Sequence, residues 1–510
     1  MTFTDPLFLC CLMVALLFYY ILPKILRPYL LLALSIAFYL TWGVKEIAFV
    51  LAAGIIGWLF GLIIHSFVPK DNPKAKITGG RKAARIFFLW TGALIMIFMW
   101  IYAKYGEELL VLLAGAKLSL NIELLVPIGI SYYTLSVIGY MADVYFRKTA
   151  PAGNPIHFLM FVLYFPKVLQ GPIANWRDLK EQITRGQGAD YRSFCFGAQL
   201  FLFGLFKKIV IADRLTVLLA GIFKEGADVS GSILLLGLLL RPLELYADFS
   251  GYVDMAEGIS EMFGIRMAEN FRRPFFSRTV PEFWRRWHIT LGAWFKDYVY
   301  MPLAVSPFMI RFTGWIRKVF GKRAARTVSA AIPLLVVWIL TGLWHGTGVN
   351  YLIWGLYWGI LIILSTIFTP EFTKLRKKRG WEEKGGAYHF LQMLRTYLLF
   401  AIGRWITLPG KEEVLQRILD LKKFRFGQLF DYSSLFQFGL AEKQVRVLAL
   451  SLVFLLVCSL VQEKKSIRET VEKWALPVRW LAYYGFIFFI LIFGYYGPGY
   501  DASAFIYMQF

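Results

Sequence analysis

The sequence predicts an all-α, polytopic membrane protein, and two observations lead to this prediction. Of the 510 residues, 58% are hydrophobic and only 17% are charged, whereas charged residues make up about a quarter of an ordinary soluble domain. Apolar runs of transmembrane length also recur from one end of the chain to the other. We therefore expect a single transmembrane domain over residues 1–510, a helical bundle with about 11–12 membrane segments.

Positive charge is the other marked feature of the composition. Lys and Arg number 56 against 33 Asp and Glu, which gives a formal net charge of +23. In a membrane protein this excess indicates basic loops on the cytoplasmic side, so we expect contact with membrane lipid and no nucleic-acid partner. The four cysteines lie in apolar surroundings without metal-ligand spacing, and we expect neither a metal site nor a disulfide framework.

The first part of the chain predicts four crossings. Residues 7–22 form a helix that we interpret as retained, because no basic region precedes it and no cleavage site follows it. Three further helices are expected at 28–42, 46–68 and 86–103. Basic links follow the first and third helices at Lys24–Arg27 and Lys70–Arg85, which places the N-terminus on the outer side of the membrane.

The next three apolar stretches are interrupted. Leu124–Phe146 contains proline and glycine and is rich in Tyr and Ser, so we expect it to pack inside the bundle rather than face lipid. Residues 155–175 are too short and too broken to span, which predicts a re-entrant or interfacial segment. Phe194–Phe223 carries charges near its middle, which predict an interfacial helix followed by a second segment rather than one crossing.

The run Ile233–Ile259 is apolar apart from charged residues, which a membrane accommodates only in pairs or at functional sites. These residues are Arg241, Glu244, Asp248, Asp254 and Glu257. One interpretation is a structural network of ion pairs with Arg241 and nearby arginines. The other is a functional site in which Asp248 takes part. Ser250 and Gly251 follow Asp248 and are expected to break the helix there.

Two stretches combine a histidine with aromatic residues, and the first is Pro281–Tyr298. It contains, in order, Trp284, Arg285, Arg286, Trp287, His288 and Trp294. The pattern is typical of a membrane-interface helix whose polar face turns toward a cavity. An aromatic belt with a structural histidine is the alternative interpretation.

The second stretch, Thr341–Asn350, places Trp344 and His345 between two long apolar runs. An ionisable side chain at such a place is unfavourable in lipid and is by default a functional candidate, although a neighbouring carbonyl group also satisfies many core histidines. Glycines at positions 342, 346 and 348 allow the helix to break where it is shielded from lipid.

Basic residues flank this second stretch on both sides. Arg311–Arg326 and Lys374–Lys384 are expected to be cytoplasmic loops. Residues 327–369 between them are then expected to form a hairpin that turns at Gly346–Asn350.

The C-terminal part predicts three more crossings, at 388–409, 446–462 and 479–497. The polar interval Lys411–Val445 is too short to form an independent catalytic domain. The chain contains no Walker loop, GxSxG or HExxH motif. Any enzymatic chemistry is therefore expected inside the membrane.

An ordered set of short blocks resembles the membrane-bound O-acyltransferase family, and within it the alginate O-acetyltransferase branch. The blocks are Asp5–Phe8, Phe38–Gly43, Pro127–Thr134, Asp143–Tyr145, Phe165–Pro166, Gly171–Ile173, Gly204–Lys208, Ile211–Arg214, Asp248–Tyr252, Glu269–Phe271, Glu282–Trp294, Gly342–Gly346 and Phe505–Phe510. The resemblance implies a helical bundle around a central tunnel, where an acyl donor from the cytoplasm meets an acceptor from the other side. Ala304–Pro307 and Ala401–Ile406 depart from the branch's usual pattern, which leaves the acceptor open.

By this resemblance His345 matches the family's catalytic histidine, and His288 matches the second histidine of the branch. A neutral imidazole suits the removal of a proton from a hydroxyl group that attacks a thioester. Asp248 or His288 is expected to orient His345 or to stabilise its charged form. Further candidates for the tunnel wall are Trp344, Trp287, Arg285 and Arg286.

The resemblance further implies a bacterial cell-membrane enzyme whose donor substrate is acetyl-CoA or an acyl carrier thioester, without a tightly bound cofactor. The acceptor is expected to be an extracytoplasmic polysaccharide, reached directly or through an extracytoplasmic, SGNH-like acyltransferase partner. Three alternatives remain open. They are D-alanyl transfer from a carrier protein toward teichoic acid, transport of an anionic sugar or lipid through broken helices, and a non-catalytic scaffold for polysaccharide synthesis.

Overall fold

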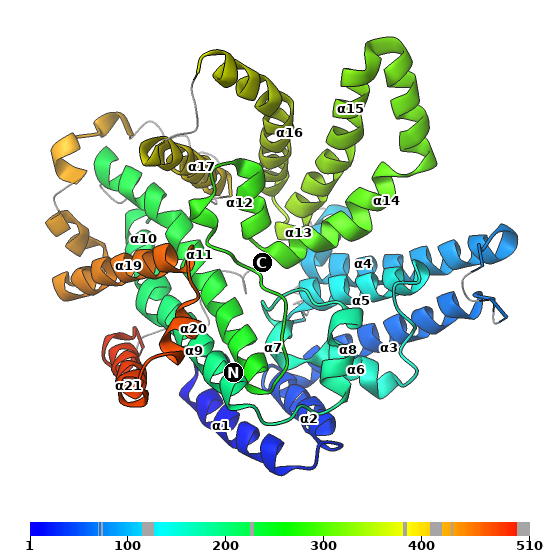
Figure 1. Ribbon diagram of the computed structural model, residues 1–510, viewed down its shortest axis with the longest axis horizontal. Helices are drawn as coiled ribbons and strands as arrows, with labels where there is room; N and C mark the ends of the chain where they lie inside the picture. Colours follow the sequence, from blue (N-terminus) through cyan, green and yellow to red (C-terminus); the bar gives the residue numbers. More distant parts are fainter. Residues whose placement is uncertain are drawn as a thin grey trace. The chain divides into compact units, whose positions relative to one another are not determined.

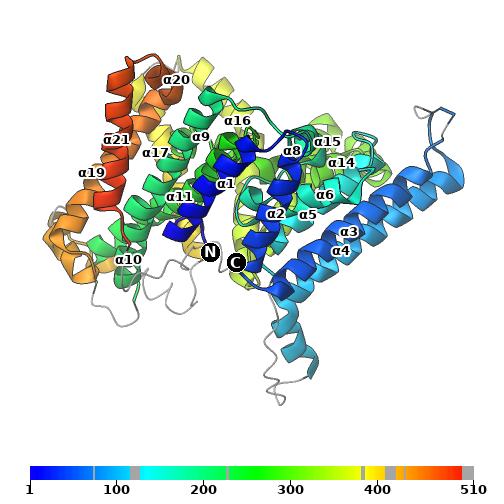
Figure 2. The same ribbon diagram turned by 90° about the horizontal axis from the view of Figure 1, so that it is seen from below.

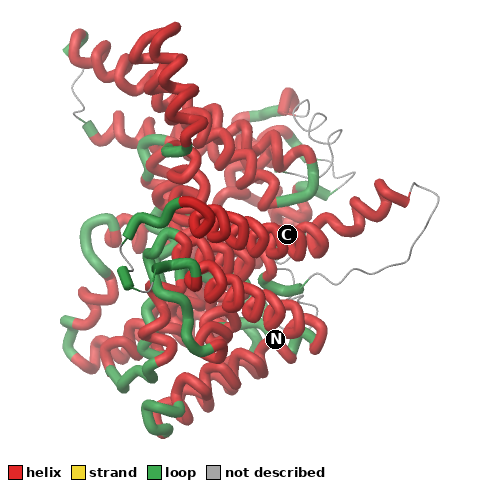
Figure 3. Tube along the Cα trace, turned by 90° about the vertical axis from the view of Figure 1, so that its right-hand side faces the viewer, coloured by secondary structure: helices red, strands yellow, loops and turns green. Residues whose placement is uncertain are grey.

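The computed structural model describes residues 1–69, 71–72, 75–114, 127–224, 229–380, 385–407, 421–429 and 432–496. Figure 3 shows these residues as helices joined by loops, and the one β pairing among them is an isolated antiparallel bridge between Phe271 and Trp287. The all-α prediction is confirmed. Parts of the predicted basic loops (residues 70, 73–74 and 381–384), residues 411–420 and 430–431 of the polar interval, and the block Phe505–Phe510 lie outside the described residues.

Seven helices in the described part of the chain are long and apolar enough to cross a membrane, so the protein is multi-pass. These candidate spans are Val44–Ser66, Gly79–Gly106, Tyr191–Ile222, Pro307–His345, Val349–Lys378, Glu442–Gln462 and Leu476–Phe493. The chain groups into two compact units, which are described separately below. The single-domain assignment and the number of membrane segments stay predictions.

The first unit comprises residues 1–201 and 255–269. Its helices are α1 (Pro6–Ile21), α2 (Arg27–Leu40), α3 (Val44–Ser66), α4 (Gly79–Ala114), α5 (Ile130–Tyr145), α6 (Pro155–Leu163), α7 (Phe165–Val168), α8 (Trp176–Thr184) and most of α9 (Tyr191–Leu205). The helices α6 and α7 have nine and four residues, so neither is long enough to span, as the sequence predicted.

The helices α3, α4 and α5 pack against one another in this unit (Figure 2). Nearly every residue of α5 is buried, which confirms its expected place inside the bundle. A glycine permits the close approach of α3, because a Cβ added at Gly61 would lie 2.5 Å from the hydroxyl oxygen of Tyr140. That oxygen accepts a hydrogen bond from the backbone N–H of Ala152 at 3.0 Å.

The second unit comprises the described parts of residues 202–254 and 270–510. Its main elements are η1 (Phe206–Ala212), α10 (Asp213–Ile222), α11 (Gly231–Met262, as far as residue 254), α12 (Val280–Arg286), α13 (Ile289–Phe295), η3 (Lys296–Tyr300), α14 (Met301–Ala304), α15 (Pro307–His345), α16 (Val349–Lys378), α17 (Gly386–Ile406), α19 (Glu442–Gln462), α20 (Ile467–Glu472) and α21 (Leu476–Phe493). Four short 3₁₀ turns are η2 (Pro274–Phe276), η4 (Leu421–Lys423), η5 (Phe426–Leu429) and η6 (Tyr432–Phe438).

The stretch Tyr191–Ile222 is one continuous helix, in which α9 passes into the π-helical η1 and then into α10. The prediction of an interfacial helix followed by a separate segment is therefore wrong. The charges that suggested a break are paired within the protein, since the Nζ atom of Lys208 lies 2.9 Å from Asp213 and 2.6 Å from Asp248. Paired charges let the helix continue through apolar surroundings.

The helix α11 also continues through Ser250 and Gly251, so the predicted break beyond Asp248 is wrong as well. The hydroxyl of Ser250 donates to the carbonyl oxygen of Tyr246, one turn earlier, at 2.6 Å. Gly251 allows a close helix contact, because a Cβ there would lie 2.9 Å from the carbonyl oxygen of Gly204. Both residues therefore serve packing within a regular helix.

The basic stretch Arg311–Arg326 is helical rather than a loop, because it forms the first part of α15. The helix is interrupted at Gly321, whose φ of +82° is accessible to glycine, and Figure 1 shows the chain turning sharply within α15. The second part of α15 packs along α16, and the two helices are separated by Gly346–Gly348. The predicted hairpin over 327–369, with its turn at these glycines, is confirmed.

Candidate active site

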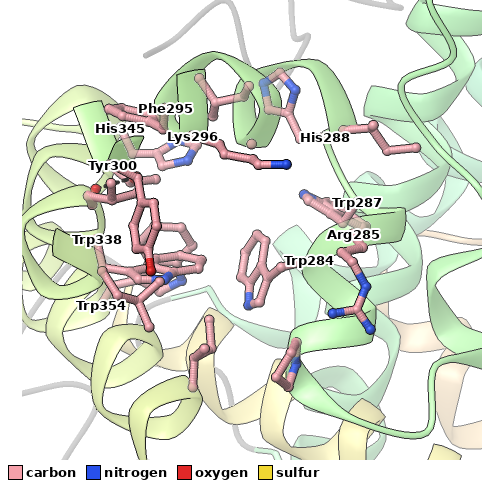
Figure 4. A pocket seen from close by; sticks show the side chains of 18 of the residues that line it. Trp284, Arg285, Trp287, His288, Phe295, Lys296, Tyr300, Trp338, His345 and Trp354 are labelled. Carbon is pink, nitrogen blue, oxygen red and sulfur yellow. Dashed lines mark hydrogen bonds between the residues drawn. The ribbon is translucent and has the colours of Figure 1, made fainter. Parts of the chain in front are cut away.

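A cavity of about 700 Å³ lies in the second unit, between the loop-linked helices α12 and α13, the segment η3, and the helices α15, α16 and α17. Its volume falls in the range of small-molecule sites. Figure 4 shows tryptophan side chains along its wall and the imidazoles of His288 and His345 on one side of it. The structure thus brings both sequence-predicted histidines to one cavity, although 56 residues lie between them in the chain.

His345 is the last residue of α15, and the chain leaves the helix at the extended Gly346. Its half-buried imidazole lies against two tryptophans, with ring centroids 4.9 Å from Trp344 and 4.9 Å from Trp354. The close approach of α16 depends on glycine, because a Cβ at Gly346 would collide with the ring of Tyr351. The glycines of this stretch therefore hold the histidine against the wall of the cavity.

His288 lies in the loop between α12 and α13, with a φ of +47° that is strained for a non-glycine residue. Its side chain is 3% exposed, and burial lowers the pKa of its imidazole to about 3. The imidazole is therefore neutral at physiological pH. Its Nδ1 atom lies 3.2 Å from the side-chain oxygen of Asn270.

The loop that carries His288 is held by backbone pairing with the segment around Asn270. The N–H of Ile289 donates to the carbonyl oxygen of Asn270 at 3.0 Å, and the N–H of Arg272 donates to that of Arg286 at 2.9 Å. These bonds surround the isolated bridge between Phe271 and Trp287. A short extended pairing, rather than a longer helix, therefore sets the position of His288.

Trp344 lies between the two histidines without lining the cavity itself. Its ring centroid is 4.9 Å from that of His345 and 6.1 Å from that of His288. The indole is buried, so it spaces the imidazoles by packing. Trp287 and Arg285, by contrast, line the cavity.

Asp248 and Arg286 lie elsewhere. Asp248 is 1% exposed, forms the ion pair with Lys208 described above, and is absent from the lining of the cavity. Two other acids of the run are also paired, Asp254 with Lys207 at 2.8 Å and Glu244 with Arg241 at 2.6 Å. The structure thus shows ion pairs of the expected kind, with Arg241 for Glu244 as expected and with lysines of η1 in place of arginines for Asp248 and Asp254.

Arg286 forms ion pairs with Glu282 and Glu463, each at 2.8 Å, and does not line the cavity. Its neighbour Arg285 does. Neighbouring residues on a helix point in different directions, so the two arginines face different surroundings. The pattern of tryptophans and cations in the sequence does not indicate which of the two faces the cavity.

The cavity wall also holds charged and phenolic side chains that were not predicted from the sequence: Lys296, Tyr300, Tyr351 and Arg404. Lys296 and Tyr300 are the two ends of η3, a π-helical segment of the kind often found at functional sites, and Figure 4 shows the Lys296 side chain projecting into the cavity. Two signals were present in the sequence. Lys296 belongs to the aromatic stretch Pro281–Tyr298, and Arg404 to the stretch that departs from the family pattern.

Charge in the cavity has one sign among the described residues. Arg285, Lys296 and Arg404 line it, and no Asp or Glu of the described chain does. A cationic, largely aromatic cavity suits a ligand that combines an anionic group with an apolar or sugar-like body.

Comparisons with known proteins agree with the motif order. A model of the MBOAT, membrane-bound O-acyltransferase family, matches residues 152–312. The "Probable alginate O-acetylase" of Pseudomonas putida is 30% identical over 468 residues, covering 90% of this chain and 87% of that protein. A peptidoglycan O-acetyltransferase of Helicobacter pylori is 30% identical over 408 residues, 73% of this chain and 72% of that protein. A teichoic acid D-alanyltransferase of Bacillus subtilis is 30% identical over 257 residues, 49% of this chain and 61% of that protein.

Proposed function

The chain belongs to the membrane-bound O-acyltransferase family and is a multi-pass O-acyltransferase, and from this premise we propose that it transfers acetyl groups. The donor is acetyl-CoA on the cytoplasmic side of a bacterial cell membrane. The acceptor is a hydroxyl group of an extracytoplasmic polysaccharide, reached directly or through an extracytoplasmic acyltransferase partner. The observation that carries the proposal is the pair of histidines in one cationic, aromatic cavity.

The proposed chemistry centres on His345. Its neutral imidazole takes the proton of the acceptor hydroxyl as the hydroxyl oxygen attacks the thioester carbonyl carbon. The tetrahedral intermediate then collapses, the carbon–sulfur bond breaks, and the imidazolium returns the proton to the leaving thiolate. Base assistance of this kind is worth about 10² to 10⁴-fold in rate. Tryptophans on the cavity wall, Trp284, Trp338 and Trp354 among them, limit access of water to the thioester.

The cations of the cavity support an anionic donor. Arg285, Lys296 and Arg404 provide charge-assisted hydrogen bonds of the kind that phosphate and carboxylate groups receive. Acetyl-CoA carries such phosphates, and so does a carrier-bound thioester. Charge alone therefore does not separate the two donors.

Coverage of the relatives favours acetyl transfer. The proteins named as O-acetylases match most of this chain, whereas the D-alanyltransferase of Bacillus subtilis matches about half of it. D-alanyl transfer from a carrier protein is the second candidate, since that relative shares the family.

The proposal is tested with purified protein in detergent and radiolabelled acetyl-CoA. We expect release of CoA in the presence of an acetylatable polysaccharide, and we expect His345→Gln to abolish it. His389→Gln is the matched control, because His389 lies outside the cavity beside Arg278. A protein that ignores acetyl-CoA but accepts a D-alanyl carrier thioester supports the second candidate. Comparing envelope acetyl content with and without the gene tests the acceptor class in the cell.

A further inference from the structure

One oxygen atom beside the active-site loop receives hydrogen bonds from three groups. The side-chain oxygen Oδ1 of Asn270 lies 3.2 Å from Nδ1 of His288, 3.1 Å from the backbone N of Thr290 and 2.8 Å from the hydroxyl oxygen of Thr290. Asn270 is 0% exposed. All three contacts of this buried oxygen are to residues of the loop that carries His288. Asn270 is therefore well placed to fix the position of that loop.

The chemistry of the three contacts determines which hydrogen atoms are present. A backbone N–H is always a donor, so the Asn270 atom that faces Thr290 N is the carbonyl oxygen and not the NH₂ group. An oxygen without hydrogen accepts only, so Nδ1 of His288 must carry a proton to bond with it. A neutral imidazole has one N–H, and Nε2 is then the ring nitrogen with the lone pair.

Burial keeps the imidazole of His288 in its neutral form, with one N–H. The rings of Phe249 and Trp344 face the imidazole, with centroids at 4.9 Å and 6.1 Å, and burial lowers its pKa to about 3. The ring therefore stays neutral, and the hydrogen is on Nδ1 alone rather than on both nitrogens.

Asn270 also holds the backbone of the same loop. Its own carbonyl oxygen accepts from the N–H of Ile289 at 3.0 Å, next to His288 with its left-handed φ of +47°. A strained residue of this kind persists only where the surroundings over-determine it. Bonds from one asparagine to His288, Ile289 and Thr290 supply that constraint.

We propose that Asn270 is a positioning residue that fixes His288 in the Nδ1–H tautomer, so that Nε2 presents its lone pair to a hydroxyl group of the acyl acceptor beside the one that attacks. The part of this inference that concerns the hydroxyl rests on the proposed function, and the tautomer does not. In this arrangement His288 holds the acceptor by accepting a hydrogen bond from a second hydroxyl group that does not react, while His345 removes the proton of the hydroxyl group that attacks the thioester.

The tautomer is tested by ¹⁵N NMR of histidine-labelled protein in detergent or lipid. The chain has five histidines, and the signal lost in His288→Gln assigns His288. We expect the Nδ1–H tautomer, unchanged between about pH 5 and pH 8, and we expect Asn270→Leu to shift it toward the Nε2–H form. An Nε2–H tautomer in the parent protein, or the same tautomer in folded Asn270→Leu, overturns the proposal.

Kinetics test the positioning role with a matched pair of variants. Asn270→Leu should lower kcat about 10 to 100-fold with little change in KM for the thioester, since misorientation of a reacting group costs rate rather than donor binding. Thr290→Val removes one bond to the same oxygen while leaving the bond to His288, so kcat should stay within about two-fold. Equal loss in both variants would assign Asn270 a structural role only.

Asn270→Asp keeps an acceptor oxygen and adds a negative charge beside Nδ1. The carboxylate raises the pKa of His288, so the doubly protonated imidazole should persist to higher pH in the ¹⁵N spectrum than it does in the parent. An unmoved midpoint in the folded variant contradicts the proposal, even if Asn270→Leu fails to fold. If the parent releases no CoA from acetyl-CoA, the proposed donor is wrong, whereas the ¹⁵N spectrum still decides the tautomer.

Discussion

Two buried groups of ionisable residues in the second unit are arranged in opposite ways. Around η1, Lys207 and Lys208 meet Asp248, Asp254 and Asp213 within 3 Å, so positive and negative charges alternate. In the cavity, cations and imidazoles gather without a described carboxylate among the lining residues. The first group is satisfied by its own partners, as a structural network must be. The second group carries only positive charge and surrounds an open cavity, which is the arrangement of a site that binds an anion.

The largest difference between the two regions is expected for the substitution His345→Gln, which should reduce activity without reducing stability. We expect acyl transfer to fall by about 10² to 10⁴-fold because a glutamine cannot act as a base, while the melting temperature in detergent stays near that of the parent. Acetyl-CoA turnover and tryptophan fluorescence during heating measure the two effects. Normal turnover in a well-folded variant would end the general-base role of His345.

The opposite pattern is expected for Lys208→Met in the paired cluster. The change leaves Asp248 and Asp213 as buried carboxylates without their lysine, which should destabilise the protein by about 3 to 5 kcal/mol. The double variant Lys208→Met with Asp248→Leu should recover part of this loss. Thermal unfolding of the parent, Lys208→Met, Asp248→Leu and the double variant measures the coupling. A Lys208→Met protein of parental stability but without activity would place this cluster in the chemistry instead.

Charge in the cavity should affect substrate affinity more than rate. We expect Arg404→Leu and Lys296→Met each to raise KM for the donor about ten-fold, because each removes a charge-assisted contact of about 1.5 kcal/mol or more. Lys322→Met is the control, since Lys322 is an exposed cation on α15 that does not line the cavity. Unchanged KM in both cavity variants would show that the donor's charge binds elsewhere.

The smallest effect is expected for Arg286→Gln. Its ion pairs with Glu282 and Glu463 are about one quarter exposed, so solvent screening should limit their loss to about 1 kcal/mol or less, and turnover should not change. Heating in detergent and the acetyl-CoA assay check this. A severe loss of turnover would mean that Arg286 acts on the site despite facing away from it.

Sequence patterns predicted the elements of the site better than its wall. The break in the helix at His345 was predictable, because Gly342, Gly346 and Gly348 lie within a few residues of it in the sequence. His288 was located only as part of an aromatic stretch, and nothing in that stretch indicates the left-handed backbone or the contact with Asn270. Arg404 was visible only as a departure from a family pattern, and its place in the wall comes from the packing of α17.

Two of the wrong predictions have a common physical reason. Charges within Phe194–Phe223 and the Ser250–Gly251 pair are local signals for a helix end, and both lie inside continuous helices. Lysines of η1 are neutralised by acids of α11, and Gly251 fits the backbone of Gly204. Ion pairs and close packing with residues distant in the chain therefore outweighed the local tendency of these segments to end a helix.

The amino-acid sequence by itself determined the all-α membrane class, the hairpin of α15 and α16, and the presence of two histidine-bearing stretches. These follow from lengths of apolar runs and from glycine positions, which act over a few turns of chain. Only the tertiary structure decided that His288 and His345 share a cavity, that Asp248 belongs to Lys208, and that Asn270 holds the His288 ring. Each of these depends on which helix faces lie together, and that is set by packing between residues distant in the chain.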